Sequence, residues 1–141
     1  MRKLNILAVG LLSCLMCFNA TAQENQGKPI ASYPSPAKPV DCEGVTTYVE
    51  TAMVMAQEAG EDSYLIIIAR LGDGEWSRKL NPDRVNTVKA FMKRWRGKSV
   101  VAEGERVKGY GRLEIYVGGK QAFILPLRRN ARVDFWSCMF P

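Results

Sequence analysis

The sequence predicts a single α+β domain: a mixed sheet of about four or five strands with two helices on one face. Three observations indicate this class. Two segments place apolar residues at helical spacing, one short run is apolar and β-branched, and the C-terminal third alternates apolar and polar residues around glycine turns. A strand, a helix and a strand in this order favour a parallel pair with a right-handed crossover. Antiparallel hairpins then follow this βαβ core.

The two predicted helices cover residues 41–59 and 82–96. In the first, apolar residues recur every three or four positions and Gly60 is placed to end the helix. Its start is left open between Asp41 and Thr47, since a capping box at Thr47 is a second possibility. In the second, Asn81 is a good N-cap, Pro82 suits the first helical position, and Gly97 follows the last turn.

Five segments are predicted to be strands. The first is apolar on both faces, so we expect a central strand that is covered on both sides, or nearly so. Gly118 and Gly119 predict a two-residue hairpin turn between the third and fourth strands. The predicted strands are residues 63–70, 99–103, 112–117, 120–128 and 132–138.

The N-terminus has the three-part pattern of a secretory signal peptide. A basic start precedes a short apolar run, and Ala20 to Ala22 provides a small-x-small cleavage signal. We expect residues 1–22 to be removed and the protein to be periplasmic or secreted. No later run has the length of a membrane span, and an exported protein is not expected to bind nucleic acid.

Residues 23–40 precede the domain, which we place at residues 41–141. This stretch contains four prolines and few apolar residues, which predicts a disordered leader. Loss of the signal peptide lowers the formal net charge from +6 to +4, because Arg2 and Lys3 leave with it. The remaining excess is too small to specify a partner.

Two cysteines remain after cleavage, Cys42 and Cys138, and an even pair in an oxidising compartment predicts a disulfide bond. This bridge would join the start of the domain to its end. The alternative is a lipoprotein, since the sequence "LLSC" resembles a lipidation motif that ends at Cys14. Lipidation there would retain Cys17 as an odd thiol.

The sequence favours a protein that is not an enzyme and needs no cofactor or metal. It has no histidine, so the usual general base and a common zinc ligand are missing. The carboxylate pairs Asp73/Glu75 and Glu103/Glu105 lie in a glycine turn and at a strand end. Both are typical surface positions.

Arg84 stands out because it falls in the first turn of the second helix, where a cation opposes the helix dipole. One interpretation is an arginine whose stem covers apolar surface, or one that pairs with Asp83, Asp73 or Glu75. The functional interpretation is a guanidinium directed at a ligand carboxylate, with Asp73 holding the ligand's ammonium group. Together the two would suit an amino-acid head group.

The stretch from Ser63 to Val117 resembles the OmpA-like peptidoglycan-binding domain. "LNPDRVNTVKAFM" matches the family's helix motif and "GYGRLEIYV" its glycine turn and following strand. In that family an aspartate and an arginine hold the carboxylate and ammonium groups of diaminopimelate. The resemblance assigns these roles to Asp73 and Arg84. The matched helix positions are Leu80, Asn81, Arg84, Val88, Phe91 and Met92.

We therefore expect a non-catalytic periplasmic module that binds the peptidoglycan stem peptide through Asp73 and Arg84. The alternative is a small secreted, disulfide-bonded protein that binds another envelope or extracellular protein, without ligand binding or catalysis. Strand edges and the aromatic C-terminal sequence "DFWSCMF" motivate this second hypothesis.

Overall fold

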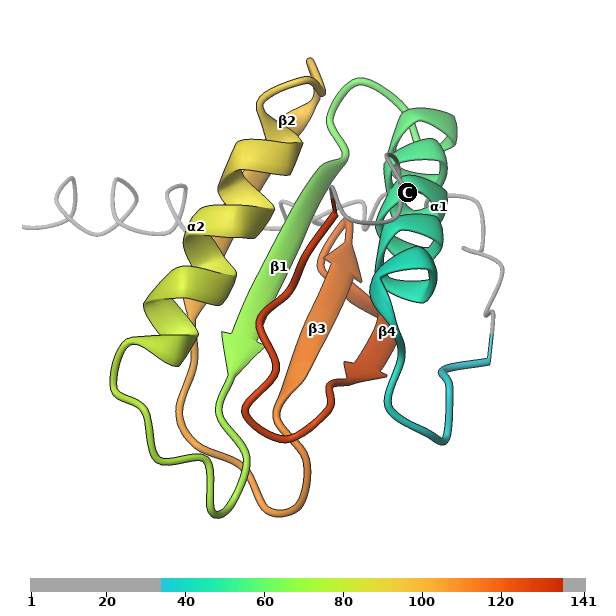
Figure 1. Ribbon diagram of the computed structural model, residues 1–141. Coiled ribbons are helices and arrows are strands. Elements are labelled where there is room, and N and C mark those ends of the chain that lie inside the picture. The colour runs from blue at the N-terminus through green and yellow to red at the C-terminus, as the bar shows by residue number, and fades with distance from the viewer. Residues whose placement is uncertain (1–33, 136–141) are drawn as a thin grey trace, which may run out of the picture.

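The computed structural model describes residues 34–135 and confirms the α+β fold class (Figure 1). One mixed sheet has the strand order β2-β1-β3-β4. The pair β1 and β2 is parallel, as predicted for a βαβ unit, and the pairs β1/β3 and β3/β4 are antiparallel. The elements are α1 (Cys42–Glu58), β1 (Tyr64–Arg70), α2 (Leu80–Met92), β2 (Lys98–Glu103), β3 (Arg112–Val117) and β4 (Lys120–Pro126).

Both helices lie on the same face of the sheet, and the segment that follows β4 runs between them (Figure 1). Alternation along β1 directs Leu65, Ile67 and Ala69 to this face, where each is fully buried. Phe135, near the end of the described segment, stacks on Phe91 of α2 with 4.1 Å between ring centroids. The C-terminal segment therefore completes the apolar layer between the helices.

The opposite face of the sheet carries no helix among the described residues, and we refer to it as the uncovered face. Ile66 and Ile68 of β1 point to it and are only partly buried, and Val100 of β2 is 56% exposed. The prediction was a central strand covered on both sides, or nearly so. In the part of the chain that the structure describes, β1 is central and its second face carries no helix, although Ile66 and Ile68 are partly buried there. The spacing of apolar residues shows that both faces of a strand are apolar, but it does not show whether other elements pack against each face.

The start of α1 is set by Asp41, which resolves the alternatives left open by the sequence. The Asp41 Oδ1 atom accepts a hydrogen bond from the Gly44 N–H at 2.9 Å, as an N-cap does. The capping box at Thr47 is not used, because the Thr47 hydroxyl donates to the Glu43 carbonyl inside the helix. Gly60 follows the helix with φ of 105°, a conformation that favours glycine.

The boundaries of α2 differ from the prediction at both ends. The helix begins at Leu80, so Asn81 is not its N-cap but a buried residue of the first turn. The Asn81 Nδ2 atom donates to the Ala69 carbonyl at 3.0 Å and to Glu103 Oε2 at 3.3 Å, which ties α2 to the ends of β1 and β2. The helix ends at Met92 instead of Arg96.

The hairpin between β3 and β4 is confirmed, with φ of 55° at Gly118 and 79° at Gly119. These two positive angles are those of the type I′ turn. The last predicted strand, residues 132–138, is not extended into the sheet over its described part, residues 132–135. The remainder of that prediction lies outside the described residues.

The outer edge of β4 is occupied by the segment that leads into α1. The Ser35 Oγ atom accepts a hydrogen bond from the Ile124 N–H at 2.9 Å, and the Val40 N–H donates to the Pro126 carbonyl at 2.9 Å. Residues 34–40, the last part of the predicted disordered leader, thus run along β4. The predicted signal peptide and the rest of the leader lie outside the described residues. Within the described part, no helix has the length and apolar character needed to cross a bilayer.

Candidate functional site

Three loops meet at one end of the sheet, where β1, β2 and β4 finish (Figure 1). They are residues 71–79, 104–111 and 127–131, and we refer to them together as the loop end. Backbone hydrogen bonds join them: Asp73 N–H to Gly109 O at 3.0 Å, Val107 N–H to Leu71 O at 2.8 Å, and Leu127 N–H to Gly111 O at 2.7 Å. The loop end is therefore a cross-linked surface and not three independent loops.

Gly72 allows the first two loops to approach so closely. A Cβ atom at this position would lie 2.3 Å from the Gly109 carbonyl oxygen and 2.3 Å from the Gly111 nitrogen. Both are backbone atoms that cannot turn away, so only glycine fits between the loops.

Arg84 lies beneath the loop end and is completely buried. Its Nη1 atom donates to Glu75 Oε2 at 3.0 Å and its Nη2 atom to Glu75 Oε1 at 2.7 Å, which is a bidentate ion pair. The Nε and Nη2 atoms also donate to the Ala131 carbonyl, at 3.1 and 2.8 Å. One guanidinium thus holds the first loop and the segment after β4 to α2.

Glu75 is buried as well, with 2% of its surface exposed. In addition to Arg84, it accepts hydrogen bonds from the Gly72 N–H at 2.8 Å and the Asn130 N–H at 2.9 Å. Burial by itself would raise the pKa of Glu75, but the hydrogen bonds from Arg84, Gly72 and Asn130 outweigh it and hold the pKa below the usual value. The carboxylate is therefore ionised and fully engaged inside the protein.

The two residues predicted to bind a ligand thus have different surroundings. Asp73 is exposed, and its Oδ2 atom accepts a hydrogen bond from the Gly109 N–H at 3.3 Å. Arg84 is buried against Glu75, one of the pairings that the sequence left open. A ligand carboxylate would reach the Arg84 guanidinium only by displacing Glu75 from an ion pair that excludes water.

Two aromatic side chains project from the loop end into solvent. Trp76 is 81% exposed and Tyr110 is 56% exposed. Trp76 directly follows the anchored Glu75, and Tyr110 stands between two glycines whose carbonyls accept hydrogen bonds from neighbouring loops. The sequence analysis did not single out either residue. Each aromatic is flanked by glycines or charged residues and not by an apolar pattern, and this sequence context could have predicted that both are exposed.

The loop end is also strongly basic. Arg129 packs over the first loop, where a Cβ on Gly74 would lie 1.7 Å from its Nη2 atom. Glu75 is neutralised by Arg84, which leaves Asp73 and Glu105 as the acidic residues on this surface. The six basic residues of the three loops are all exposed: Arg78, Lys79, Arg106, Lys108, Arg128 and Arg129.

A second ionic cluster lies on the uncovered face, next to the loop end, where β1 ends at Arg70 and β3 begins at Arg112. Glu114 of β3 is 3% exposed and sits between two arginines. Its Oε2 atom is 2.9 Å from Arg70 Nε, its Oε1 atom is 2.6 Å from Arg112 Nη2, and the Tyr116 hydroxyl donates to Oε2 at 3.0 Å. Burial would raise the pKa of Glu114, but the hydrogen bonds from Arg70, Arg112 and Tyr116 hold it below the usual value.

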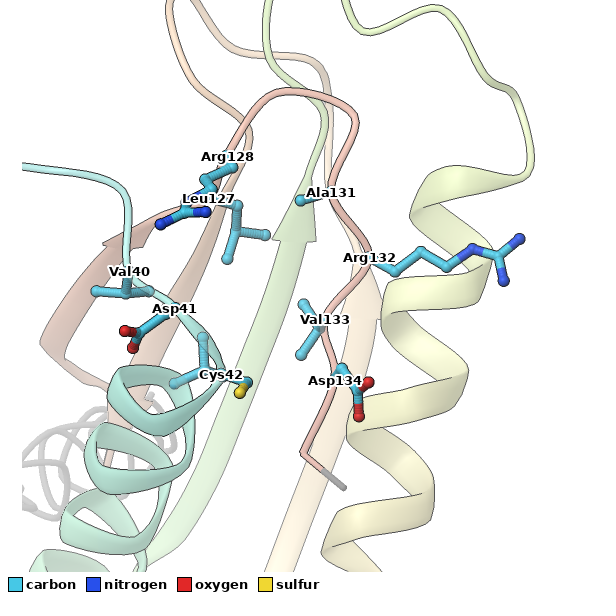
Figure 2. A pocket seen from close by; sticks show the side chains of 10 residues that line it. Val40, Asp41, Cys42, Leu127, Arg128, Ala131, Arg132, Val133 and Asp134 are labelled. Atoms are coloured by element: carbon cyan, nitrogen blue, oxygen red, sulfur yellow. The ribbon is translucent and has the colours of Figure 1, made fainter. Parts of the chain in front are cut away.

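A shallow hollow of about 190 Å³ opens beside the first turn of α1 (Figure 2). Its lining combines the buried apolar side chains of Val45, Leu127 and Val133 with four charged residues, Asp41, Arg128, Arg132 and Asp134. The volume is below the range of about 300–1,000 Å³ that is usual for small-molecule sites. No group of three or more metal-ligating side chains occurs between residues 34 and 135.

Cys42 borders the same hollow, and its sulfur points toward the segment that contains Val133 and Asp134 (Figure 2). Cys42 is disulfide-bonded, and it is the one cysteine within the described residues, 34–135. Cys138 itself is outside them, so the pairing of Cys42 with Cys138 stays a prediction.

Comparison with known proteins adds no relative. No protein family, no curated protein and no solved structure matches this chain.

Proposed function

We propose that this protein is a non-catalytic binding module of the cell envelope, and that it binds peptidoglycan through the loop end. The observation that carries the proposal is the pair of exposed aromatic side chains, Trp76 and Tyr110, on a rigid and basic surface. The predicted signal peptide and the resemblance to the OmpA-like domain support the envelope as the location.

The aromatic groups suit the sugar part of this ligand. The apolar faces of sugar rings pack on aromatic rings, and the rings of Trp76 and Tyr110 are exposed for such a contact. Because Glu75 and the two glycines beside Tyr110 are hydrogen-bonded, the loops that carry the aromatics are ordered before binding. Little conformational entropy is then lost on association.

The basic groups suit the peptide part, because peptide stems carry free carboxylates. Arg129 and Lys108 represent the exposed cations that surround the two aromatics. An excess of positive charge on one surface attracts an anionic polymer and gives binding that weakens as salt screens the charges.

In this proposal, Asp73 and Arg84 have different roles. Arg84 and Glu75 hold the loops in place from below. Asp73 is an exposed acidic group of the loop end, in contact with the residue before Tyr110, and is available to a ligand ammonium group. The ligand is recognised above the ion pair and not by the Arg84 guanidinium.

Co-sedimentation of the purified protein with peptidoglycan sacculi tests the proposal. We expect the double variant Trp76→Ala/Tyr110→Ala to bind about tenfold more weakly or worse, as loss of central aromatic contacts does. The matched control is Val54→Ala/Tyr64→Ala, which removes two exposed apolar side chains away from the loop end (51% and 40% exposed) and should bind normally. Equal binding by both double variants would exclude the loop end as the site.

Charge reversal separates the contribution of the cations. Lys108→Glu/Arg128→Glu should reduce sedimentation with sacculi in low salt. The difference from the unmodified protein should shrink in about 1 M salt, where the Debye length is about 3 Å.

Asp73→Ala tests the residue that the resemblance assigns to the ligand's ammonium group. Loss of binding with Asp73→Ala alone would support a contact to the ammonium group of the stem peptide.

The uncovered face favours a second candidate function, the binding of another envelope protein. Ile66, Ile68 and Val100 lie together on this face by strand register, without a covering element in the described chain. If the unmodified protein captures a stoichiometric envelope protein but does not sediment with sacculi, and an Ile68→Asp variant loses that protein, the result would support this function instead.

A further inference from the structure

The two helices carry opposite charge, although they lie on the same face of the sheet (Figure 1). Residues 41–62, which include α1, contain acidic residues and no basic residue. The acidic residues are all exposed: Asp41, Glu43, Glu50, Glu58, Glu61 and Asp62. The flank of the helical layer that α1 forms is therefore acidic.

The segment that includes α2 is basic. Between residues 76 and 100 the chain contains one acidic residue, Asp83, and its carboxylate lies 3.5 Å from the Arg132 guanidinium. Arg84 is buried in its ion pair with Glu75. The other basic residues of the segment are all exposed: Arg78, Lys79, Lys89, Lys93, Arg94, Arg96 and Lys98.

Most of these cations lie along α2 and the turn that follows it. Lys89 and Lys93 are one helical turn apart, and exposed Asn86 and Ala90 lie on the same side of the helix. The Lys93 N–H donates to the Lys89 carbonyl at 3.1 Å, so the helical hydrogen bonding extends to this residue. We refer to the following five exposed residues as the basic face: Lys79, Lys89, Lys93, Arg94 and Arg96.

The apolar side of α2 is already used inside the protein. Val85, Val88 and Phe91 are at most 5% exposed and belong to the core, and no large apolar side chain of α2 is exposed. The helix therefore has no apolar group with which to enter a bilayer. It also has none to anchor a protein partner, because the cores of protein interfaces are depleted of charge and rich in apolar contacts.

The extent of the basic face indicates a large anionic partner and not a small anion. Lys79 and Lys93 bracket the 13 residues of α2, which makes the helix about 20 Å long. The hollow beside α1 has no lining residue from α2, so the cations do not converge on an enclosed site. Spaced cations on an outward helix suit a flat array of anionic groups.

We propose that the basic face binds the surface of an anionic lipid bilayer through the phosphate groups of its lipids. The contact is peripheral and electrostatic, and each basic residue near such a surface strengthens binding about fivefold. The acidic flank on α1 is repelled by the same surface, so the protein binds with α2 toward the bilayer. The predicted signal peptide favours a bilayer over nucleic acid, because an exported protein meets membranes.

Co-sedimentation of the mature chain with lipid vesicles tests this proposal, which is independent of the proposed function. We expect binding at low salt to vesicles that contain phosphatidylglycerol, no binding to pure phosphatidylcholine, and release in about 1 M salt, where the Debye length is about 3 Å. Lys89→Gln/Lys93→Gln should weaken binding about tenfold or more. The matched control is Lys38→Gln/Lys120→Gln, which removes the same charge from two exposed lysines beside β4 and should bind normally. Equal binding by the two double variants, or no binding by the unmodified protein, would overturn the proposal.

Two further measurements separate the basic face from the loop end and from other anions. Trp76→Ala/Tyr110→Ala should keep vesicle binding, and Lys89→Gln/Lys93→Gln should keep sacculus binding, so either proposal can fail alone. Loss of vesicle binding only in the aromatic variant would place the bilayer contact at the loop end and overturn this proposal. Binding to a duplex DNA fragment but not to vesicles would overturn it as well. Melting temperatures show that each variant is folded, and glutamine has nearly the helix propensity of lysine.

Discussion

Two glutamates of this protein are ionised and nearly inaccessible, but they are stabilised in different ways. Glu75 faces one arginine, and both side chains are sealed from water, with 1% and 0% of the side-chain surface exposed. Glu114 is 4% exposed at its side chain, but its partners Arg70 and Arg112 are 23% and 32% exposed. The first cluster is a closed pair inside the protein, and the second is a carboxylate covered by two arginines that reach water.

The comparison shows that burial of the carboxylate alone does not determine what the cluster does. Arg84 and Glu75 join residues that are far apart in the chain, since the Ala131 carbonyl and the Asn130 N–H belong to the same network. Glu114, Arg112 and Tyr116 are neighbours on one strand, and only Arg70 comes from another. We therefore expect the first cluster to be essential for the loop end and the second to make a modest contribution to the sheet surface.

The largest effect is expected for Arg84→Leu. This change leaves the Glu75 carboxylate buried without its counter-charge, and we expect the free energy of unfolding to fall by about 3–5 kcal/mol. Urea denaturation measures this value. The double variant Glu75→Leu/Arg84→Leu is the control, because removal of both charges should recover much of the loss. If the single variant is as stable as the unmodified protein, the pair is not the link that holds the loops.

Acid should weaken both clusters. The pKa of Glu75 and that of Glu114 are both lowered from the ordinary value of 4.5. The stabilisation that they provide is therefore fully present above about pH 4.5 and is lost as the pH falls through the lowered folded-state values. Urea midpoints measured between pH 6 and pH 2 should decrease, and the decrease should be smaller in the double variant Glu75→Leu/Arg84→Leu. An unchanged slope would indicate that Glu75 does not contribute.

Glu114→Gln should have a smaller effect than Arg84→Leu. The amide keeps the shape and part of the hydrogen bonding, and the two arginines that lose their counter-charge are hydrated, so we expect a loss of about 1 kcal/mol. Urea denaturation again gives the value. A loss as large as that of Arg84→Leu would contradict the distinction between the sealed and the hydrated cluster.

Arg112→Gln is expected to have the smallest effect, at most about 0.5 kcal/mol, because a partly exposed ion pair contributes little. Arg70 remains as a counter-charge 2.9 Å from the Glu114 carboxylate. Its measurement alongside Arg70→Gln shows whether the two arginines are interchangeable. A large loss for either one would indicate that Glu114 depends on both.

Much of the fold was predictable because local rules and tertiary packing agree there. The first strand and the Gly118-Gly119 turn appear where apolar spacing and turn chemistry placed them, and the predicted crossover helix is present although both of its ends differ. The start of α2 was missed because the Asn81 side chain is used across the sheet by Ala69 and Glu103 instead of capping its own helix. The residues around Asn81 contain no pattern that predicts contacts with residues as distant in sequence as Ala69 and Glu103.

The candidate site was likewise predictable in part from the sequence and in part only from the tertiary structure. Arg84 was singled out from its unfavourable place in the first helical turn, and the ion pair with Glu75 was among the alternatives. That Glu75 is the partner depends on the loop turning back at Gly72, and on the segment near Ala131 closing over the pair. The exposure of Trp76 and Tyr110 follows from the same loop packing.

The sequence by itself determined the α+β class, the parallel pair and the glycine hairpin, because each depends on periodicity or turn chemistry within a few neighbouring residues. Within residues 34–135, tertiary structure decided which carboxylate meets Arg84, that one face of the sheet carries no helix and that β2 has a strand neighbour on one side alone. These depend on residues that are distant in sequence, and their electrostatic and packing energies exist only once the chain has brought them together.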